Sequence, residues 1–275
     1  YKSIPILMYH GLSVKPIDND DSYHITVDDF RSQIEYLSSN NFKTISLQDL
    51  LMFKNGLKPS LPDKPVLITF DDGFYSLYRF AMPILLEFGF NPILFLTSGF
   101  VHSVDLEIDI EEFDIEVAKD DRPLQWNELI EMTSNGWDIQ SHTSTHPIMS
   151  DLNLQETINE YESSKMLIEK ELKLKVDYFA YPYGNYSRLT VNTIKDLGVK
   201  LAFSVHPGKM TRLSPKYRLP RIEINSSDSM HVFINKVENG YPNSNEMLKG
   251  GFRRLLFRSA LIKDFIHSLF PHYVN

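Results

Sequence analysis

The sequence predicts an α/β fold in which strand and helix alternate and close into a parallel barrel of about seven or eight units. Short apolar runs recur along the chain, and longer amphipathic segments separate most of them. Hydrophobic residues make up 42% of the 275, enough for a sizeable core, and the 23% of charged residues excludes a disordered chain. A doubly wound open sheet remains the alternative at this point.

Eight runs are expected to form the strands. Most are apolar at successive positions, so both faces of the strand would be buried, as in the parallel sheets of α/β proteins. The runs are residues 4–9, 43–47, 66–70, 92–96, 137–142, 178–183, 201–205 and 221–224.

Six segments between these runs are expected to be helices, because their apolar residues recur at helical spacing. Ser46 and Asp49 have the spacing of a capping box at the start of one helix. Leu197 and Gly198 form a typical end for another. The six segments are residues 26–41, 46–53, 76–90, 124–136, 153–172 and 188–198.

Two segments interrupt the alternation. Residues 102–122 are acidic and are interpreted as an insertion in a βα loop, either a solvated loop or a rim that shapes a substrate groove. Residues 248–270 have the pattern of a basic amphipathic helix, which either packs on its own domain or contacts a membrane surface or a partner. We therefore expect a catalytic domain in residues 1–245 and a C-terminal helix in residues 246–275.

Composition excludes several classes of function. The chain has no cysteine, so disulfides, thiolate catalysis and cysteine-type zinc sites are excluded. Its formal net charge of −8 argues against a nucleic-acid partner. No apolar run reaches transmembrane length. Because the chain starts at Tyr1, we expect a signal segment to be absent from it and the protein to be extracellular, periplasmic or on the cell surface.

Polar residues follow several of the expected strands. Asp71 and Asp72 follow residues 66–70, while His10, His142 and His206 stand at the ends of three other runs. Since the carboxyl ends of parallel strands meet at one rim of a barrel, these side chains are expected to form one site.

His142 and His146 have a spacing that would let both imidazoles bind one metal ion. A carboxylate is the usual third ligand, and a divalent cation would offset the repulsion between Asp71 and Asp72. One aspartate would then bind the metal while the other accepts a proton from water. The alternative for Asp71-Asp72-Gly73 is a helix cap followed by a turn.

Three motifs at these positions resemble the polysaccharide deacetylases of carbohydrate esterase family four, the NodB-homology domain. They are "TFDDG" (69–73), "SHTSTH" (141–146) and "FAYPYG" (179–184), and the resemblance covers roughly residues 4–240. It implies a distorted (β/α)7-8 barrel of the NodB-homology type. It also implies metal-dependent hydrolysis of an N-acetyl group on an amino sugar, with release of acetate.

The resemblance assigns roles residue by residue. Asp71 matches the general base, and Asp72, His142 and His146 match the metal ligands. Tyr183 would offer its backbone N–H to the oxyanion. The metal is expected to be zinc, although cobalt, nickel, manganese or iron would suit the same ligands.

The sequence departs from the family pattern in two places. Ala180 stands where many members carry an arginine that orients the base, and Arg218 or Arg221 could take that role instead. No clear copy of the late leucine–histidine motif is present, because residues 229–233 look like part of a helix.

The early stretch "PILMYHGLS" (5–13) resembles the branch that deacetylates poly-N-acetylglucosamine in biofilm matrices, where an early histidine replaces the late one. His10 is therefore the expected general acid and His206 the second choice.

The expected substrate is extracellular poly-N-acetylglucosamine, an exopolysaccharide. Chitin oligomers, peptidoglycan, a lipid-linked sugar, or a non-catalytic carbohydrate-binding role remain alternatives. Pro182, Tyr183, Arg221 and Tyr75 are the residues expected to contact the substrate.

Overall fold

The computed structural model describes residues 2–15, 23–57, 59–101 and 121–249. The acidic segment 102–122 lies outside the described residues except for its last two. The basic segment 248–270 lies outside them except for its first two.

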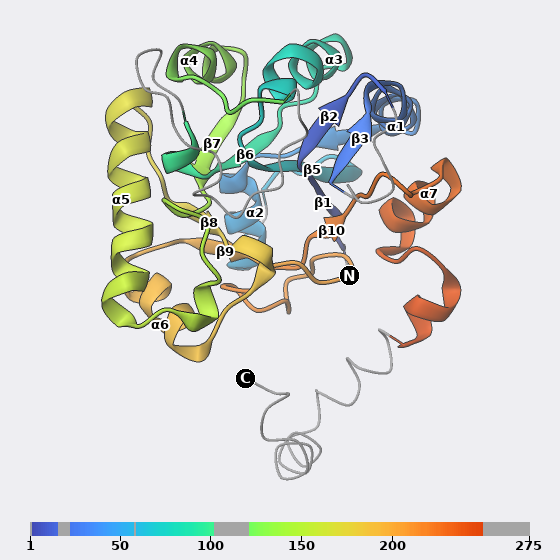
Figure 1. Cartoon of the computed structure of the whole chain (residues 1–275). Coiled ribbons are helices and arrows are strands. Elements are labelled where there is room, and N and C mark those ends of the chain that lie inside the picture. Colours follow the sequence, from blue (N-terminus) through green and yellow to red (C-terminus); the bar gives the residue numbers. More distant parts are fainter. Residues whose placement is uncertain (1, 16–22, 58, 102–120, 250–275) are drawn as a thin grey trace, which may run out of the picture.

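The centre of the molecule is an eight-stranded parallel sheet, as the sequence predicts (Figure 1). Its order is β10-β1-β5-β6-β7-β8-β9, and β4 pairs with the beginning of β5. All eight strands fall within or across the expected runs. They are β1 (Ile6–Tyr9), β4 (Phe42–Thr44), β5 (Lys64–Asp72), β6 (Ile93–Leu96), β7 (Asp138–Ser141), β8 (Tyr178–Ala180), β9 (Leu201–Phe203) and β10 (Ile222–Glu223).

The two ends of the strand order come together through the residues before β10. The backbone N–H of Leu219 donates to the carbonyl of Ala202 on β9, and Ser204 N–H donates to Leu219, both at 2.9 Å. Three residues later, Ile222 is paired with Leu7 on β1. The sheet is therefore curled into an irregular barrel rather than an open doubly wound sheet.

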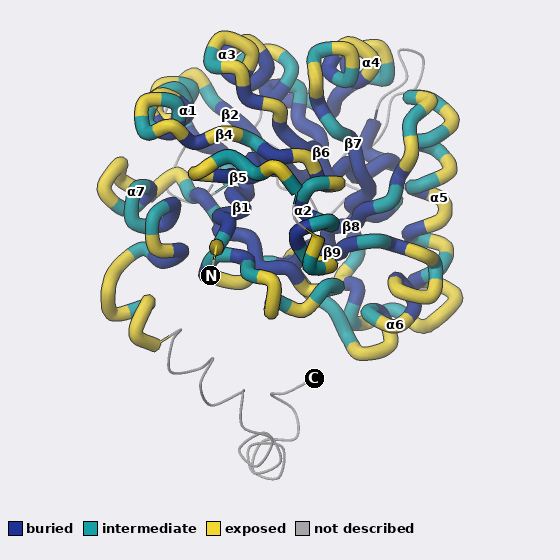
Figure 2. Tube along the Cα trace, turned by 180° about the vertical axis from the view of Figure 1, so that it is seen from behind, coloured by how far each residue is buried: buried dark blue, intermediate teal, exposed yellow. Residues whose placement is uncertain are grey.

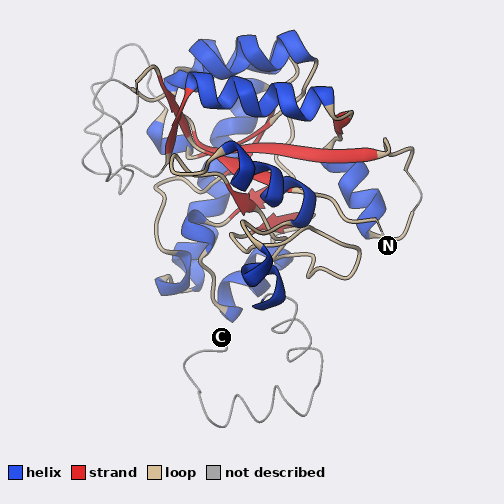
Figure 3. Ribbon diagram, turned by 90° about the vertical axis from the view of Figure 1, so that its right-hand side faces the viewer, coloured by secondary structure: helices blue, strands red, loops and turns tan. Residues whose placement is uncertain are grey.

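Helices surround the curled sheet (Figures 1 and 3). The capping box at Ser46 and Asp49 is present at the start of α2, and Gly198 follows α6 with a φ of 84°. A π-helical turn, Leu77–Ala81, precedes α3. The helices are α1 (Val27–Ser39), α2 (Leu47–Lys54), α3 (Met82–Phe88), α4 (Trp126–Ser134), α5 (Leu154–Leu172), α6 (Arg188–Asp196) and α7 (Met230–Asn239).

Three elements go beyond the sequence prediction. The strands β2 (Gly11–Ser13) and β3 (His24–Thr26) pair with each other in parallel. Helix α7 is the third, of which the sequence indicated only a part. Each of the two strands has three residues, which is too short for an apolar run or an alternation to be recognised.

The core has two parts. Figure 2 shows the strands buried in the middle and the exposed residues on the outer sides of the helices. A smaller apolar cluster fills the inside of the curl. There the rings of Phe95 on β6 and Phe203 on β9 pack with their centroids 5.1 Å apart, although their strands are not neighbours. In the part of the chain that the structure describes, no helix combines the length and the apolar composition needed to span a membrane.

Candidate active site

The carboxyl ends of the strands surround a cavity of about 220 Å³. Six of the residues singled out in the sequence line it, although they come from four separate parts of the chain. The lining residues are Met8, His10, Tyr23, Asp71, Asp72, Phe74, His142, His146, Tyr183, Val205 and Glu223.

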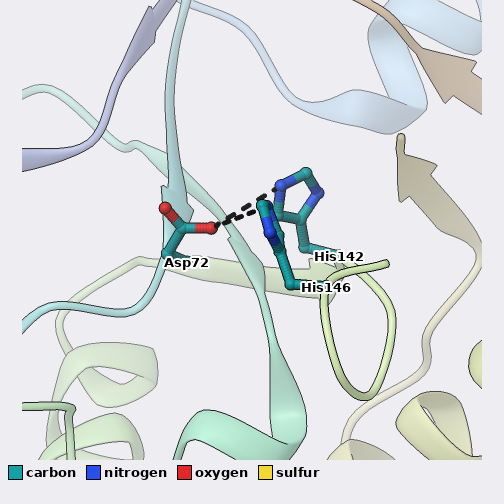
Figure 4. A group of neighbouring side chains, drawn as sticks. All are labelled: Asp72, His142 and His146. Atoms are coloured by element: carbon teal, nitrogen blue, oxygen red, sulfur yellow. Dashed lines mark ion pairs between the residues drawn. The ribbon is translucent and has the colours of Figure 1, made fainter. Parts of the chain in front are cut away.

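Asp72, His142 and His146 converge on one point at the wall of this cavity. Asp72 Oδ1 lies 3.7 Å from Nε2 of His142 and 3.4 Å from Nε2 of His146. Figure 4 shows both imidazole rings directed at this single carboxylate oxygen. All three side chains are buried, and one ligand atom from each lies within 4.8 Å of the other two.

The protonation states of this group fit a bound cation. Nδ1 of His142 donates to the carbonyl of Ala180 at 2.9 Å, which leaves the lone pair of Nε2 directed at Asp72. Burial lowers the pKa of His142 to about 3, so this imidazole is neutral. Asp72 Oδ1 is buried without a hydrogen-bond donor, and burial raises the pKa of Asp72 to about 7. The lone pairs of His142 Nε2 and Asp72 Oδ1 face each other and repel. A divalent metal ion between them would accept both lone pairs and remove the repulsion.

Local backbone geometry brings the three ligands together. Asp72 ends β5 with a φ of 72°, and Gly73 follows with a φ of 118°. His146 also has a positive φ, 60°, and its N–H donates to Thr143 Oγ1 at 3.0 Å. Non-glycine residues with positive φ are uncommon and are concentrated at functional sites. These turns give the carboxylate and the second imidazole directions that a regular strand would not.

A glutamate on α5 holds the loop between the two histidines. The carboxylate of Glu160 accepts the backbone N–H groups of Ser144 and Thr145, both at 2.9 Å. It also accepts the hydroxyl of Thr145 at 2.7 Å. Glu160 was not among the residues predicted from the sequence, because nothing in a helical glutamate 14 residues after His146 marks it as a partner of that loop.

Asp71 has a different environment from its neighbour. Its two oxygens accept Nη1 and Nη2 of Arg221, each at 2.6 Å. Burial raises the pKa of Asp71, but the charge of Arg221, together with His142 and the hydrogen bonds, outweighs it and lowers that pKa to about 2. Asp71 is therefore ionised and fixed in direction. Of the two arginines considered from the sequence, Arg221 is the one that binds Asp71, while the guanidinium of Arg218 lies 5.7 Å from the ring centre of Tyr186.

The two candidate general acids occupy different places. His10 follows β1 and lines the cavity with the two aspartates. Burial lowers the pKa of His10, while the charges of Asp72 and Asp71 partly oppose that shift. His206 is exposed and does not line the cavity. Its Nε2 lies 3.1 Å from the hydroxyl of Tyr186 and 3.3 Å from that of Ser204.

The expected substrate contacts divide into two groups. Tyr183 lines the cavity with 46% of its surface exposed, and its ring centroid lies 4.6 Å from that of His146. Arg221 is only 1% exposed, binds Asp71 and does not line this cavity, although it forms part of the wall of a smaller neighbouring one. Pro182 and Tyr75 do not line the cavity, and the guanidinium of Arg122 lies 3.8 Å from the ring centre of Tyr75. Contact of Pro182, Arg221 and Tyr75 with substrate therefore stays a prediction.

Residues 58–202 match the family model described as polysaccharide deacetylase. A relative from Staphylococcus aureus, poly-beta-1,6-N-acetyl-D-glucosamine N-deacetylase, is 29% identical over 239 residues, which cover 82% of this chain and 75% of the relative. The Bacillus subtilis protein YxkH, a putative polysaccharide deacetylase by name, is 27% identical over 84% of this chain and 74% of its own length.

Among solved structures, the Streptococcus pyogenes deacetylase PplD in complex with acetate superposes with a TM-score of 0.73 and 24% identity, over 86% of this chain and 99% of that one. IcaB from Ammonifex degensii gives a TM-score of 0.69 and 22% identity, over 86% and 95%. These likenesses show that the curled parallel barrel is a fold these proteins share.

Proposed function

Because this chain belongs to the polysaccharide deacetylase family, we propose that it removes N-acetyl groups from poly-N-acetylglucosamine and releases acetate. The relative named for this activity supports the choice of polymer. One observation carries the proposal: a carboxylate and two imidazoles share a cavity with a second carboxylate that an arginine holds in place. A biofilm polymer lies outside the cell, so the proposal includes export of the enzyme to the surface or beyond.

Asp72, His142 and His146 would hold the metal, which we propose to be zinc. One oxygen and two nitrogen ligands suit zinc, and also cobalt, nickel, manganese or iron, so supply in the cell would contribute to the choice. When bound, such an ion acidifies water and polarises a carbonyl oxygen.

Asp71 is the proposed general base. The guanidinium of Arg221 donates to both oxygens of Asp71 and lowers its pKa. The carboxylate is therefore ionised, and able to accept a proton, over the whole neutral range. The same contact fixes its orientation toward the cavity, and a base in a fixed position lowers the entropy cost of the reaction. Arg221 thus acts through Asp71 as a positioning residue.

His10 is the proposed general acid, which gives a proton to the departing amine. It lines the cavity beside both aspartates. Burial lowers the pKa of His10, and the charges of Asp72 and Asp71 partly oppose that shift. The backbone N–H of Tyr183 is the proposed donor to the oxyanion, a kind of contact worth about 10²–10³-fold in rate.

Acetate release from a panel of polymers tests the proposal. The metal-loaded protein is expected to release acetate from β-1,6-linked N-acetylglucosamine oligomers faster than from chitin oligomers or peptidoglycan. Faster release from either of the other two would replace the proposed substrate. Binding of the oligomers without any acetate release in metal-replete buffer would support the non-catalytic alternative.

A further inference from the structure

Glu223 ends β10 and lines the same cavity as Asp71, Asp72 and the histidines. Arg221 lies two residues before it, directly ahead of the strand, and in extended backbone that spacing directs both side chains to the same side, toward the inside of the curl. Glu223 stands nearer the open end and is half-buried. It plays no part in the mechanism above.

The carboxylate of Glu223 has no hydrogen bond or ion pair with any residue that the structure describes. The cations nearest to it along the chain are engaged elsewhere. Arg221 binds both oxygens of Asp71. Lys236 pairs with Asp228 and donates to the backbone carbonyl of Glu223 at 2.8 Å, which fixes the main chain but leaves the carboxylate unpaired.

The other carboxylates of the cavity differ from Glu223 in this respect. Asp71 has Arg221, and Asp72 belongs to the group of three ligands for a metal ion. Glu223 is not part of that group, so it is not placed to be a further ligand of the same ion. The carboxylate of Glu223 faces the cavity and is not among the buried polar atoms without a partner, so it is accessible to a cationic ligand.

A second cavity adjoins the first at this residue. It has a volume of about 150 Å³ and shares Val205 and Glu223 with the catalytic cavity. Pro207 and Pro242 add apolar wall to it. Arg221 and Lys236 also line it, but each is already paired with an aspartate, Asp71 and Asp228 respectively. Glu223 therefore stands between the space beside the metal ligands and a neighbouring space large enough for part of a sugar.

We propose that Glu223 binds the ammonium group of a glucosamine unit that is adjacent in the polymer to the unit being deacetylated. The inference rests on the proposed function, since that reaction produces glucosamine units along the chain. The protein would then prefer a partly deacetylated chain to a fully acetylated one. A neutral sugar hydroxyl is the other donor that a carboxylate could accept, and the experiment separates the two.

The test compares two β-1,6-linked pentamers, one fully N-acetylated and one that carries a single glucosamine unit. For Glu223→Gln we expect the KM for the glucosamine-containing pentamer to rise about tenfold, because a charge-assisted hydrogen bond becomes a neutral one. We expect kcat to stay within about twofold, and both constants for the fully acetylated pentamer to stay unchanged. Glu35→Gln, an exposed glutamate on α1, is the matched control.

An equal rise of KM for both pentamers would overturn the proposal in favour of a hydroxyl contact, and no change for either would remove Glu223 from substrate recognition. Calorimetric binding of a β-1,6-glucosamine tetramer needs no turnover. Weaker binding to Glu223→Gln in a protein that releases no acetate would leave this inference standing while the proposed function fails. Acetate release together with equal tetramer binding by the two proteins would support the proposed function and overturn the role of Glu223.

Discussion

Asp71 and Asp72 are neighbours in sequence but have opposite electrostatic environments. Arg221 lowers the pKa of Asp71 to about 2 against the effect of burial, whereas burial without a donor raises the pKa of Asp72 to about 7. The positive φ of Asp72 turns its side chain toward the histidines. Asp71 is therefore ionised across the neutral range, as a general base must be. The ionised form of Asp72 is unfavourable in the buried site unless a cation binds to it.

Replacement of Asp72 by asparagine is expected to stabilise the metal-free protein. The pKa of Asp72 is about 7 in the folded state, against an ordinary value of 3.8. Folding stability is therefore lost as pH rises from about 4 to about 7, because the unfolded chain releases this proton first. The melting temperature of Asp72→Asn should exceed that of the wild type by more at about pH 8 than at about pH 5, and zinc should no longer raise it. A lower melting temperature than the wild type at the higher pH would contradict the assignment.

Asp71→Asn is expected to change the melting temperature in the opposite direction from Asp72→Asn. It leaves the buried guanidinium of Arg221 without its charge partner, a change that typically costs about 3–5 kcal/mol. The melting temperature of this variant should fall. Zinc should still raise it, since the three ligands remain.

Replacement of Arg221 by lysine is expected to lower kcat by about 10²-fold, because one ammonium cannot hold both oxygens of Asp71 in place. Replacement by methionine also removes the charge, so the pKa of Asp71 rises. Because the base must be ionised, the acidic limb of the kcat/KM profile should move to higher pH. Arg218→Lys is the control. Equal pH profiles for Arg221→Met and the wild type would exclude the positioning role.

The parallel sheet explains how part of the site could be predicted. Each parallel strand ends at the same rim, so Asp71, His142 and His10 could be placed together from their positions after apolar runs alone. Glu160 and Glu223 could not be found in this way. Glu160 contacts the loop between His142 and His146 only because α5 packs beside that loop. Glu223 faces inward only because β10 pairs with β1.

Glu160→Gln is expected to weaken zinc binding by about 10–100-fold, because its carboxylate accepts three donors from the loop between the two histidine ligands. Isothermal titration with zinc measures this, while circular dichroism checks the fold. Glu162→Gln, an exposed residue on the same helix, is the matched control. Equal zinc affinity for Glu160→Gln and this control would show that the loop holds its shape without the helix.

The site depends on closure of the curled sheet into a barrel. Arg221 lies 150 residues from Asp71 in sequence, and it reaches that carboxylate only because the preceding residues cross from β9 to β1. Sequence spacing could offer Arg218 and Arg221 as equal choices, but it could not decide between them. That choice depends on which side chain points into the barrel once the last strand is paired.

A chain that ends at residue 245 is expected to fold and to keep its activity. Among the residues that the structure describes, every strand of the sheet, α7 and every residue that lines the cavity precede that point. Its melting temperature should stay within about 4 °C of the full chain, a change of about 1–2 kcal/mol at this size. Acetate release from soluble oligomers should stay within about twofold. Loss of either would assign residues 246–275 to the catalytic domain.

The whole mechanism requires Asp72, His142 and His146 to share one metal ion while Asp71 remains unbound beside them. Anomalous diffraction at the zinc edge, from a crystal of the zinc-loaded protein, detects such an ion directly. We expect one strong peak about 2.0–2.2 Å from Asp72 Oδ1 and from Nε2 of both histidines, with Asp71 still held by Arg221. A peak that includes Asp71 in the coordination, or no peak between these three residues, would exclude this arrangement.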